Sequence, residues 1–126
     1  MTTWSIDDLD RIADSTELRI ASRRGDGTLR AALTVWVVRS GDELYVRSMN
    51  GRDSSWFRGA QTRHEGHIRA HGLNRDVTFV EEADGGLNDR IDSAYRDKYG
   101  RYGDRLIQRM TSPNVRAATI RLVPRA

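Results

Sequence analysis

The sequence predicts a mostly β domain of the α+β class, namely a small antiparallel barrel of six strands, closed or split, with short helices at its ends. Three observations lead to this fold class. Strand patterns follow one another through short turns that contain glycine, as in antiparallel hairpins. The pattern over residues 33–38 is almost continuously apolar and includes a tryptophan, which indicates a strand buried on both faces or covered by a partner subunit. The helical patterns are short and stand between the hairpins, where they can cover the ends of a barrel.

Each expected element has a local signal. In chain order we expect a helix over 5–14, strands over 17–21, 28–39 and 43–48, a helix from 54 or 55 to about 62, strands over 67–70 and 74–81, helices over 88–99 and 104–110, and a strand over 117–123. Ser5 is a suitable N-cap followed by acidic residues, and Trp4 is expected to plug one end of the barrel. The glycines of the turn over 23–27 permit positive φ.

Residues 34–58 form the segment around which the chain is organised. Two strands meet there at a tight turn, and Asn50 and Gly51 end the second strand. Ser54 or Ser55 then caps a helix that carries two large aromatic residues in its first turn. The polar groups at this strand exit are therefore expected to lie beside a helix N-terminus.

The second half of the chain is expected to add a hairpin, two helices and a last strand. A turn at 65–66 precedes the hairpin, which reverses at 71–72. The helix over 88–99 has the clearest apolar face in the chain and ends at Gly100. Pro113 stops the next helix, and the last strand alternates between apolar and polar residues.

The composition favours one domain, residues 1–126, in a cytoplasmic setting. The charged share is 31% and the hydrophobic share is 37%, so much of the charge must lie on the surface or at an interface. No apolar run approaches the roughly 20 residues of a membrane span, so we expect no membrane partner, and the acidic N-terminus is unlike a signal peptide. The chain has no cysteine, which excludes disulfides and thiolate metal sites and makes the cytoplasm the expected location.

The positive charge comes almost wholly from arginine, because Lys98 is the only lysine. The net charge is +3 and the pI is about 9.8. Arginine suits bidentate contacts with carboxylates and phosphates, although a GC-rich coding bias would also enrich it. Carboxylates are interleaved with arginines along the chain, whereas a dedicated nucleic-acid binder more often has a segregated basic patch. Nucleic-acid binding rests on the pI alone and is not expected.

The exit of the second central strand is the candidate binding site for an anion. It combines two arginines, a hydroxyl and an amide beside a helix N-terminus that favours negative charge, namely Arg47, Ser48, Asn50 and Arg52. Arg23 and Arg24 in the neighbouring turn could serve the same anion. The alternative is a hairpin exit and a corner with solvated arginines.

Two groups of aromatic residues have a functional and a structural interpretation. Trp36 and Trp56 could stack on the ring of a ligand, although packing in the core or at a dimer interface is the commoner role of such residues. Tyr95, Lys98 and Tyr99 lie on or beside one helix face, where a phenol near an ammonium could act as an acid. The spacing does not match the Tyr-x-x-x-Lys pattern of dehydrogenases, which favours Tyr95 in the core and Lys98 at the rim.

The remaining titratable residues do not predict a catalytic centre. His64, His67 and His71 resemble a metal cluster by spacing alone, but His71 falls in a turn and no carboxylate or thiolate supports them, so we expect no metal site. Asp92 is expected to form an ordinary ion pair with Arg96 on a helix surface. The motifs of serine hydrolases, zincins and phosphate loops are absent, so no catalytic residue is predicted.

Short segments spread over nearly the whole chain carry a family resemblance. They are 20–28 (IASRRGDGT), 36–39 (WVVR), 44–48 (LYVRS), Gly51, 56–58 (WFR), 76–77, 91–92, 94–96, 98–99 and 119–122. In these segments the chain resembles an uncharacterised bacterial family, domain of unknown function 2255. That resemblance names a family and implies no established activity.

A second resemblance covers residues 20–60. The segment 23–27 stands where a basic turn is found, 48–51 where a glycine loop is found, and Trp56 where a tryptophan opens a helix. This half is similar to the split-barrel flavin- and deazaflavin-dependent nitroreductase-like proteins. The chain departs from their pattern in having one glycine where two are usual, no proline before the tryptophan, and an Arg-Gly pair at 58–59 in place of His-Asn.

The second resemblance implies an FMN-binding split-barrel-like fold and a homodimer with a flavin phosphate and ring near the dimer seam. We therefore expect a bound FMN or deazaflavin cofactor with reductase activity. Its predicted site residues are Arg23, Arg24, Arg47, Ser48, Asn50, Arg52 and Trp56. The alternative is a non-enzymatic small-ligand-binding or interaction module on a split barrel without a cofactor.

Overall fold

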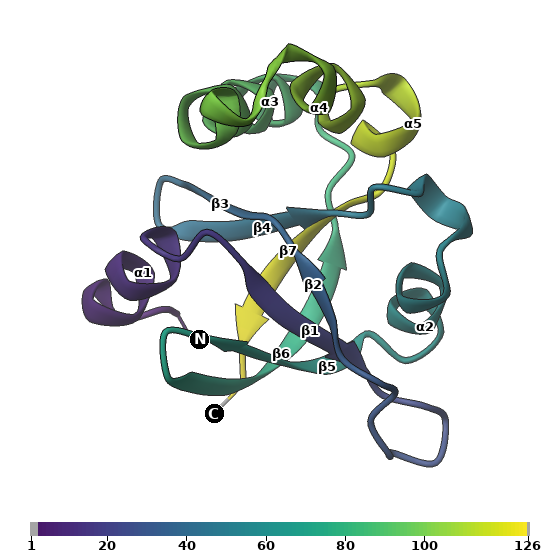
Figure 1. Ribbon diagram of the computed structural model, residues 1–126. Helices are drawn as coiled ribbons and strands as arrows, with labels where there is room; N and C mark the ends of the chain where they lie inside the picture. Colours follow the sequence, from purple (N-terminus) through teal and green to yellow (C-terminus); the bar gives the residue numbers. More distant parts are fainter. Residues whose placement is uncertain (1–2, 126) are drawn as a thin grey trace.

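A seven-stranded antiparallel sheet, curled into a nearly closed barrel, forms the centre of the computed structural model, which describes residues 3–125 (Figure 1). The strands are β1 (Leu18–Ser22), β2 (Leu33–Val35), β3 (Val37–Ser40), β4 (Glu43–Arg47), β5 (Glu65–Ala70), β6 (Leu73–Glu81) and β7 (Thr119–Pro124). The helices are α1 (Ile6–Ala13), α2 (Ser55–Arg63), α3 (Gly85–Tyr99), α4 (Asp104–Met110) and α5 (Pro113–Arg116), with 3-10 turns η1 (Gly51–Asp53) and η2 (Gly100–Tyr102). The predicted fold class is confirmed.

The two edges of the sheet are consecutive in the chain. The strand order is β2-β1-β5-β6-β7-β4-β3, so β2 and β3 lie at opposite edges although only Trp36 separates them. The barrel is therefore split at Trp36, and the chain itself crosses the split. The prediction of one strand over 28–39, and hence of six strands, is wrong, because the apolar pattern continues through a residue at which the chain leaves one edge and joins the other.

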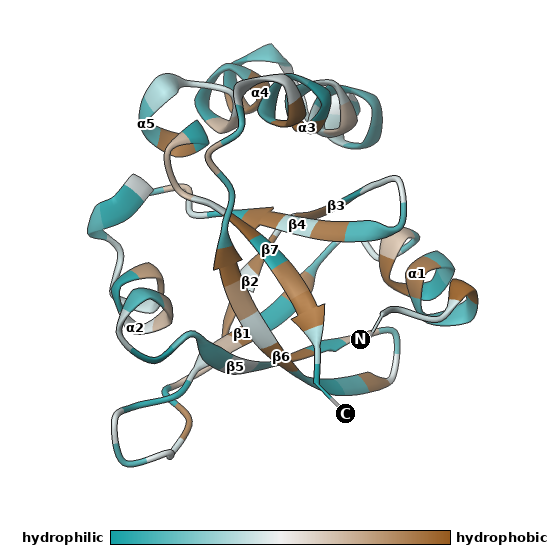
Figure 2. Cartoon of the chain, turned by 180° about the vertical axis from the view of Figure 1, so that it is seen from behind, coloured by the Kyte–Doolittle hydropathy of each residue, from teal (hydrophilic) through white to brown (hydrophobic). Residues whose placement is uncertain are grey.

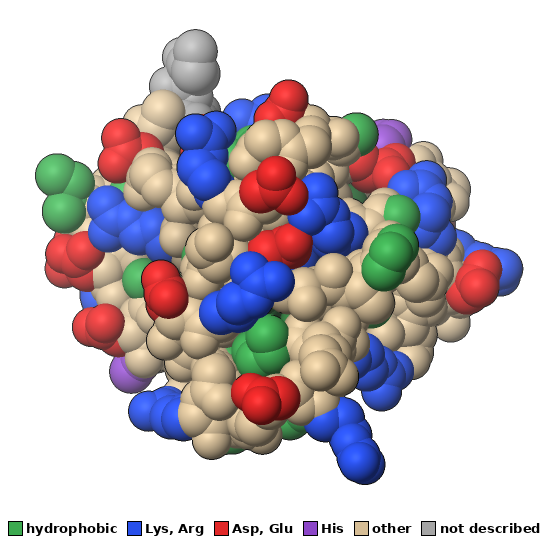
Figure 3. Space-filling model, turned by 90° about the horizontal axis from the view of Figure 1, so that it is seen from above, with side chains coloured by type: hydrophobic (Ala, Val, Ile, Leu, Met, Phe, Trp, Pro, Cys, Tyr) green, Lys and Arg blue, Asp and Glu red, His purple; other side chains and the backbone are tan. Residues whose placement is uncertain are grey.

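Apolar side chains pack in two clusters, one on each side of the sheet. The first fills the barrel, and Figure 2 shows apolar residues along the strands that surround it. Trp4 is buried there as predicted, and its indole Nε1 donates to the carbonyl of Leu122 at 2.9 Å. The second cluster lies between β3–β4 and the layer of α3, α4 and α5. The outer face of that layer carries interspersed acidic and basic side chains (Figure 3).

Side-chain caps start three of the described helices, α1, α2 and α3. The Ser5 hydroxyl accepts from the Asp8 N–H at 3.0 Å and starts α1 as predicted. The predicted start of α3 at residue 88 is three residues late, because the Asp84 carboxylate accepts from the Leu87 N–H and begins the helix at Gly85.

Two further boundaries were predicted wrongly. The turn expected at 65–66 lies instead at His64, which has φ 60°, and β5 already begins at Glu65. The last strand begins at Thr119 rather than 117, because α5 occupies the preceding residues. Among residues 3–125, none of the helices has the length and apolar character that spanning a bilayer needs.

Candidate ligand-binding site

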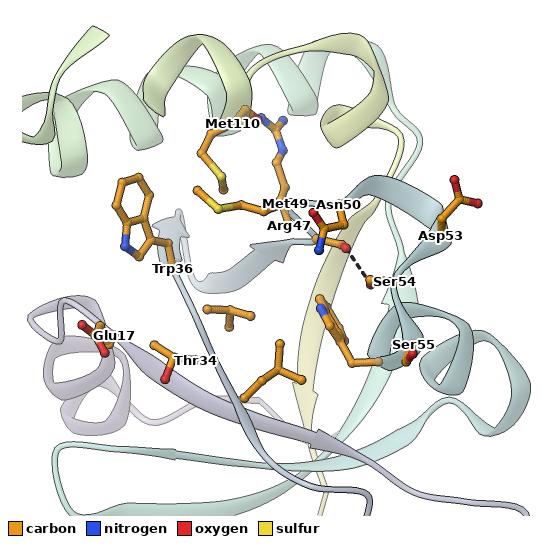
Figure 4. A pocket seen from close by; sticks show the side chains of 14 residues that line it. Glu17, Thr34, Trp36, Arg47, Met49, Asn50, Asp53, Ser54, Ser55 and Met110 are labelled. Atoms are coloured by element: carbon orange, nitrogen blue, oxygen red, sulfur yellow. Dashed lines mark hydrogen bonds between the residues drawn. The ribbon is translucent and has the colours of Figure 1, made fainter. Parts of the chain in front are cut away.

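A cavity of about 600 Å³ opens at the split of the barrel (Figure 4). Its walls come from the start of β1, from β2 and the strand break, from the exit of β4, from η1 and the start of α2, and from α4. The lining residues are Glu17, Leu33, Thr34, Val35, Trp36, Arg47, Ser48, Met49, Asn50, Asp53, Ser54, Ser55, Trp56 and Met110. The site is thus built at the strand exit that the sequence indicated.

A tight turn after β4 sets the polar wall of the cavity. Gly51 has φ 70°, which favours glycine, and a Cβ there would also displace the exposed side chain of Asn114. The turn brings the Ser48 hydroxyl to 2.7 Å from that of Ser54, which also accepts from the Phe57 N–H and caps α2. Two hydroxyls are therefore held in place beside the first turn of α2.

The opposite wall is held by side chains of α3 in place of a neighbouring strand. Trp36 stacks on Tyr99 with ring centroids 4.1 Å apart, and its carbonyl accepts from the Tyr95 hydroxyl at 3.2 Å. The N–H of Val37 donates to the Tyr99 hydroxyl at 3.1 Å, and the Val37 carbonyl accepts from Nζ of Lys98 at 2.7 Å. The backbone N–H and carbonyl groups at the strand break thus form hydrogen bonds with Tyr95, Lys98 and Tyr99 on one face of α3.

Burial keeps the two phenols protonated. It raises the pKa of Tyr95 and of Tyr99 well above the ordinary tyrosine value, which favours the neutral hydroxyl as a hydrogen-bond donor. Burial also lowers the pKa of Lys98 to about 8. The phenols are therefore unsuited to act as acids near neutral pH, and the structural interpretation of this helix face is the one that the geometry supports.

Arg47 borders the cavity, but its guanidinium is fully buried and points away toward the helical layer (Figure 4). Its Nε donates to Thr119 Oγ1 at 2.9 Å, and Nη1 donates to the Asp92 carboxylate and to the Met110 carbonyl. Its Nη2 donates to the carbonyl and the side-chain oxygen of Asn88 at 3.2 and 3.0 Å. All five donors of this arginine are therefore engaged inside the protein.

Asp92 is not the surface residue that its helix position suggested. Its side chain is only 9% exposed and pairs with Arg47 and with Nη1 of Arg116, the latter at 2.6 Å. The expected pair with Arg96 is absent from the ion pairs of residues 3–125. The acidic residue on the helix surface is instead Asp89, whose side chain is 74% exposed and which also forms an ion pair with Arg116.

The structure brings together part of the predicted site. Four of the seven residues border the cavity, namely Arg47, Ser48, Asn50 and Trp56. Arg52 turns to the opposite side of η1 and donates to Glu81 at 2.8 Å. Arg23 donates to Asp76, and Arg24 donates to the carbonyl of Leu29 in its own turn. A role for these seven residues in holding a cofactor stays a prediction.

Two features of the cavity had no signal in the sequence. Arg109 reaches the rim from α4, where its Nη2 donates to the side-chain oxygen of Asn50 at 2.9 Å and its Nε to the carbonyl of Met49. Glu17 and Asp53 add carboxylates to the lining. The lining therefore carries two carboxylates, and Arg109, which holds the lining residues Met49 and Asn50 from behind, is supplied by a helix far along the chain.

The histidines lie elsewhere. His67 lies between Asp76 and Asn74, with ring nitrogens 3.0 Å from Oδ1 of the former and 3.2 Å from Oδ1 of the latter. Within residues 3–125, no group of three or more histidine, cysteine, aspartate and glutamate residues is placed to hold a metal ion.

Comparison with known sequences identifies the family. The model of the DUF2255 family, described as uncharacterized protein conserved in bacteria, matches residues 8–122, so the chain belongs to that family. Among curated proteins, no sequence matches the chain.

Solved structures show the same fold at low identity. The heme storage protein HutZ from Vibrio cholerae has a TM-score of 0.71 and 14% identity, with 93% of this chain and 87% of that chain covered. A FAD-binding protein from Mesorhizobium loti has a TM-score of 0.63 and 18% identity, with 100% and 93% covered. An F420-H2 dependent reductase has a TM-score of 0.62 and 12% identity, with 86% and 93% covered. The barrel thus resembles solved proteins that bind different flat cofactors.

Proposed function

We propose that this split-barrel member of the bacterial family binds a flat ring ligand of the flavin or deazaflavin class. The observation that carries the proposal is the cavity of about 600 Å³ at the split, bordered by Trp36 and Trp56. Cavities of roughly 300–1,000 Å³ accommodate cofactor-sized ligands. The likeness to a FAD-binding protein and to an F420-H2 dependent reductase supports this class of ligand.

The cavity has both the apolar walls and the polar groups that a flavin-type ring requires. Trp36 has one face fixed against Tyr99, so its position in the wall is rigid. Trp56 is 5% exposed and borders the cavity, and its indole N–H is not one of the enclosed polar atoms without a partner among residues 3–125, so the N–H can reach a ligand or solvent. A ring carbonyl would supply an acceptor for this N–H, and Ser48 and Asn50 offer further hydrogen bonds to the ring edge.

The ring, rather than a phosphate, is expected to supply most of the binding free energy. Arg47 has no free donor, and Arg52 is paired with Glu81 outside the cavity. An anionic group would meet the N-terminus of α2 and Arg109, in the presence of the Asp53 carboxylate. We therefore assign Arg47 to support of the cavity wall and leave the phosphate with weaker contacts than the sequence suggested.

A bound flavin or deazaflavin would supply hydride transfer, and hence a reductase activity. A haem is a less suitable occupant, although one similar structure is a heme storage protein. Haem iron is commonly held by histidine, thiolate, methionine or tyrosine, and the only such side chains in the lining are the thioethers of Met49 and Met110. The absence of histidine from the lining favours the flavin class.

Titration with riboflavin, FMN and F420, followed by ligand fluorescence and by thermal shift, tests the proposal. We expect saturable binding of at least one of these ligands. FMN should bind no more than about tenfold tighter than riboflavin, a difference of about 1.4 kcal/mol, because the cavity offers its phosphate no unpaired buried arginine. Failure of all three ligands to bind would refute the proposal and favour a non-enzymatic interaction module.

A pair of variants distinguishes the cavity from the rest of the surface. Met49→Trp places a large side chain in the lining and should weaken binding at least tenfold. Leu87→Trp is the matched control, because Leu87 packs against the same apolar cluster without bordering the cavity. Equal affinity of both variants would place the ligand elsewhere.

We also propose that two copies associate at the split, as the predicted homodimer requires. Trp36 lines the open cavity, and the ring of Tyr102, 43% exposed, lies 5.5 Å from it. An aromatic surface beside an open cavity suits coverage by a second subunit. Light scattering that reports a monomer at all concentrations would contradict this arrangement. The cytoplasmic location stays a prediction.

A further inference from the structure

We propose a second binding site, separate from the cavity at the split, that takes a small oxyanion such as a phosphate group. It is a hollow of about 210 Å³ on the outer face of β1, β5 and β6, closed on one side by the segment 29–32 that precedes β2. Arginines from three places in the chain border it, namely Arg19, Arg30 and Arg69. In Figure 1 no helix crosses this side of β1 and β2, because the helices lie above the barrel and at its two sides.

The arrangement of two of these arginines is unfavourable without an anion. Arg19 and Arg69 are directly opposite each other in the antiparallel pair of β1 and β5. Like charges in this position are destabilising. Neither side chain forms an ion pair within residues 3–125, whereas other arginines of this chain do, for example Arg75 with Asp8 at 3.1 Å. An anion between the two guanidinium groups would turn the repulsion into attraction.

The donors of these side chains are weakly used or free. Arg19 makes only two long contacts, at 3.5 Å to Thr34 Oγ1 and at 3.4 Å to the carbonyl of Ala32. Arg69 has no hydrogen-bond partner among the described residues. Guanidinium groups bind phosphate and carboxylate oxygens in bidentate fashion. Two adjacent forks therefore match the oxygens of one tetrahedral anion.

Arg30 adds a third positive charge to the border of the hollow. Its Nε lies against Gly59 of α2, away from the residues that line the hollow, so Arg30 contributes its positive charge rather than this N–H. No acidic residue lines the hollow among the described residues, and Asp76, the partner of the lining residue His67 at 3.0 Å, is also bound by Arg23 at 3.2 Å. The local excess of positive charge is therefore not neutralised by that carboxylate.

The size of the hollow decides what kind of anion it takes. Cofactor-sized ligands need roughly 300–1,000 Å³, and 210 Å³ is below that range. Ala21 and Ala32 line the hollow between the arginines and leave room at its base. These dimensions suit an inorganic phosphate or the phosphoryl group of a larger molecule whose remainder stays in solvent.

The probe for this site is inorganic phosphate, titrated into ¹⁵N-labelled protein at constant ionic strength with chloride as the reference anion. We expect saturable shifts of the amide signals of β1 and β5 around Arg19 and Arg69, with the amides of the cavity unchanged. Arg69→Gln should weaken phosphate binding at least tenfold. Arg96→Gln is the matched control, because Arg96 is exposed on α3 far from this sheet face and forms no ion pair among the described residues.

Each outcome of this titration has a defined meaning. Shifts that rise linearly without saturation, or that are equal in Arg69→Gln and Arg96→Gln, would overturn the site. A change in association state of Arg69→Gln without any change in phosphate response would also overturn it, in favour of a protein contact. Glycerol 2-phosphate in a parallel titration distinguishes the two sources: equal affinity indicates recognition of a phosphoryl group, and loss of binding indicates free phosphate. Riboflavin binding by Arg69→Gln is an independent control for the folded state.

Discussion

Replacement of Asp92 by asparagine should cost far more stability than the same change at Asp89, although both residues lie on α3 and share Arg116. The Asp92 side chain is 9% exposed and that of Asp89 is 74% exposed. Asp92 is also the carboxylate partner of Arg47, whose side chain is 0% exposed. Asp92→Asn therefore leaves a buried guanidinium without a counter-charge.

The magnitude follows from the burial of the remaining cation. Removal of one partner of a buried ion pair typically costs about 3–5 kcal/mol, because the other charge stays desolvated. An exposed pair contributes about 0–1 kcal/mol. Part of the loss at Asp92 is offset, since the amide oxygen can still accept one hydrogen bond from Arg47 or Arg116. We therefore expect Asp92→Asn to lower the free energy of unfolding by about 3 kcal/mol, and Asp89→Asn by less than about 1 kcal/mol.

Urea unfolding at pH 7, followed by tryptophan fluorescence, measures both variants against the natural protein. Equal slopes of free energy against urea would show that the unfolded states are comparable. A domain of this size is stable by about 5–15 kcal/mol, so a loss of about 3 kcal/mol is easily resolved. If Asp92→Asn lost no more stability than Asp89→Asn, the description of Arg47 as a buried residue dependent on one carboxylate would be wrong.

Three further changes test the packing of the barrel and of the wall at the split. Gly66→Ala should destabilise by more than about 2 kcal/mol in urea unfolding, because its Cβ would clash with the backbone carbonyl of Ala21. Tyr99→Phe removes the acceptor of the Val37 N–H and should cost about 1–3 kcal/mol in the same assay. Lys98→Met should abolish a rise in stability above about pH 8: the native pKa is about 8 and the ordinary value 10.5, so the unfolded chain binds more protons between these limits. Because the ammonium is partly solvated, the rise in the free energy of unfolding is about 1 kcal/mol. It is best measured below about pH 10, because tyrosines begin to titrate at that pH.

Matched controls keep the first two of these results interpretable. Gly25→Ala should be nearly neutral, because nothing lies within 4 Å of its Cβ position. Tyr102→Phe should also be mild, since the Tyr102 hydroxyl has only an exposed contact with Arg101 at 3.3 Å. A cost at Gly25 equal to that at Gly66 would mean that glycine replacement as such, rather than the close approach of the Ala21 backbone, causes the loss.

Local signals in the sequence were enough for most elements and for the location of the cavity. Ser5 and Ser54 cap helices, and Gly51 makes the turn after β4, because these effects depend on a few neighbouring residues. The strand break at Trp36 was not predictable in this way. The apolar residues around Trp36 indicate that the segment is buried. The same apolar pattern arises whether one strand continues or two strands occupy opposite edges of the sheet.

Arg47 shows why the site was predicted only in part. An arginine at a strand exit suggested an anion ligand, yet its counter-charge comes from Asp92, 45 positions along the chain. One signal did exist: Arg47 follows the apolar run of β4 and shares strand parity with Tyr45, which packs under the helical layer. A residue of that parity is directed to the interface with α3 and not into the barrel.

The helical layer therefore supports one wall of the cavity, and this has a consequence for ligand binding. The wall at Trp36 gains its hydrogen bonds from Tyr95, Lys98 and Tyr99 of α3, since the strand there has left the β-ladder. A substitution on α3 that never touches the ligand should loosen that wall and lower affinity. Tyr99→Phe should accordingly weaken riboflavin or FMN binding while Tyr102→Phe leaves it unchanged. If Tyr99→Phe lost stability but kept full affinity, the ligand would be bound by the exit of β4 and by α2 alone, and the strand break would be a feature of folding rather than of recognition.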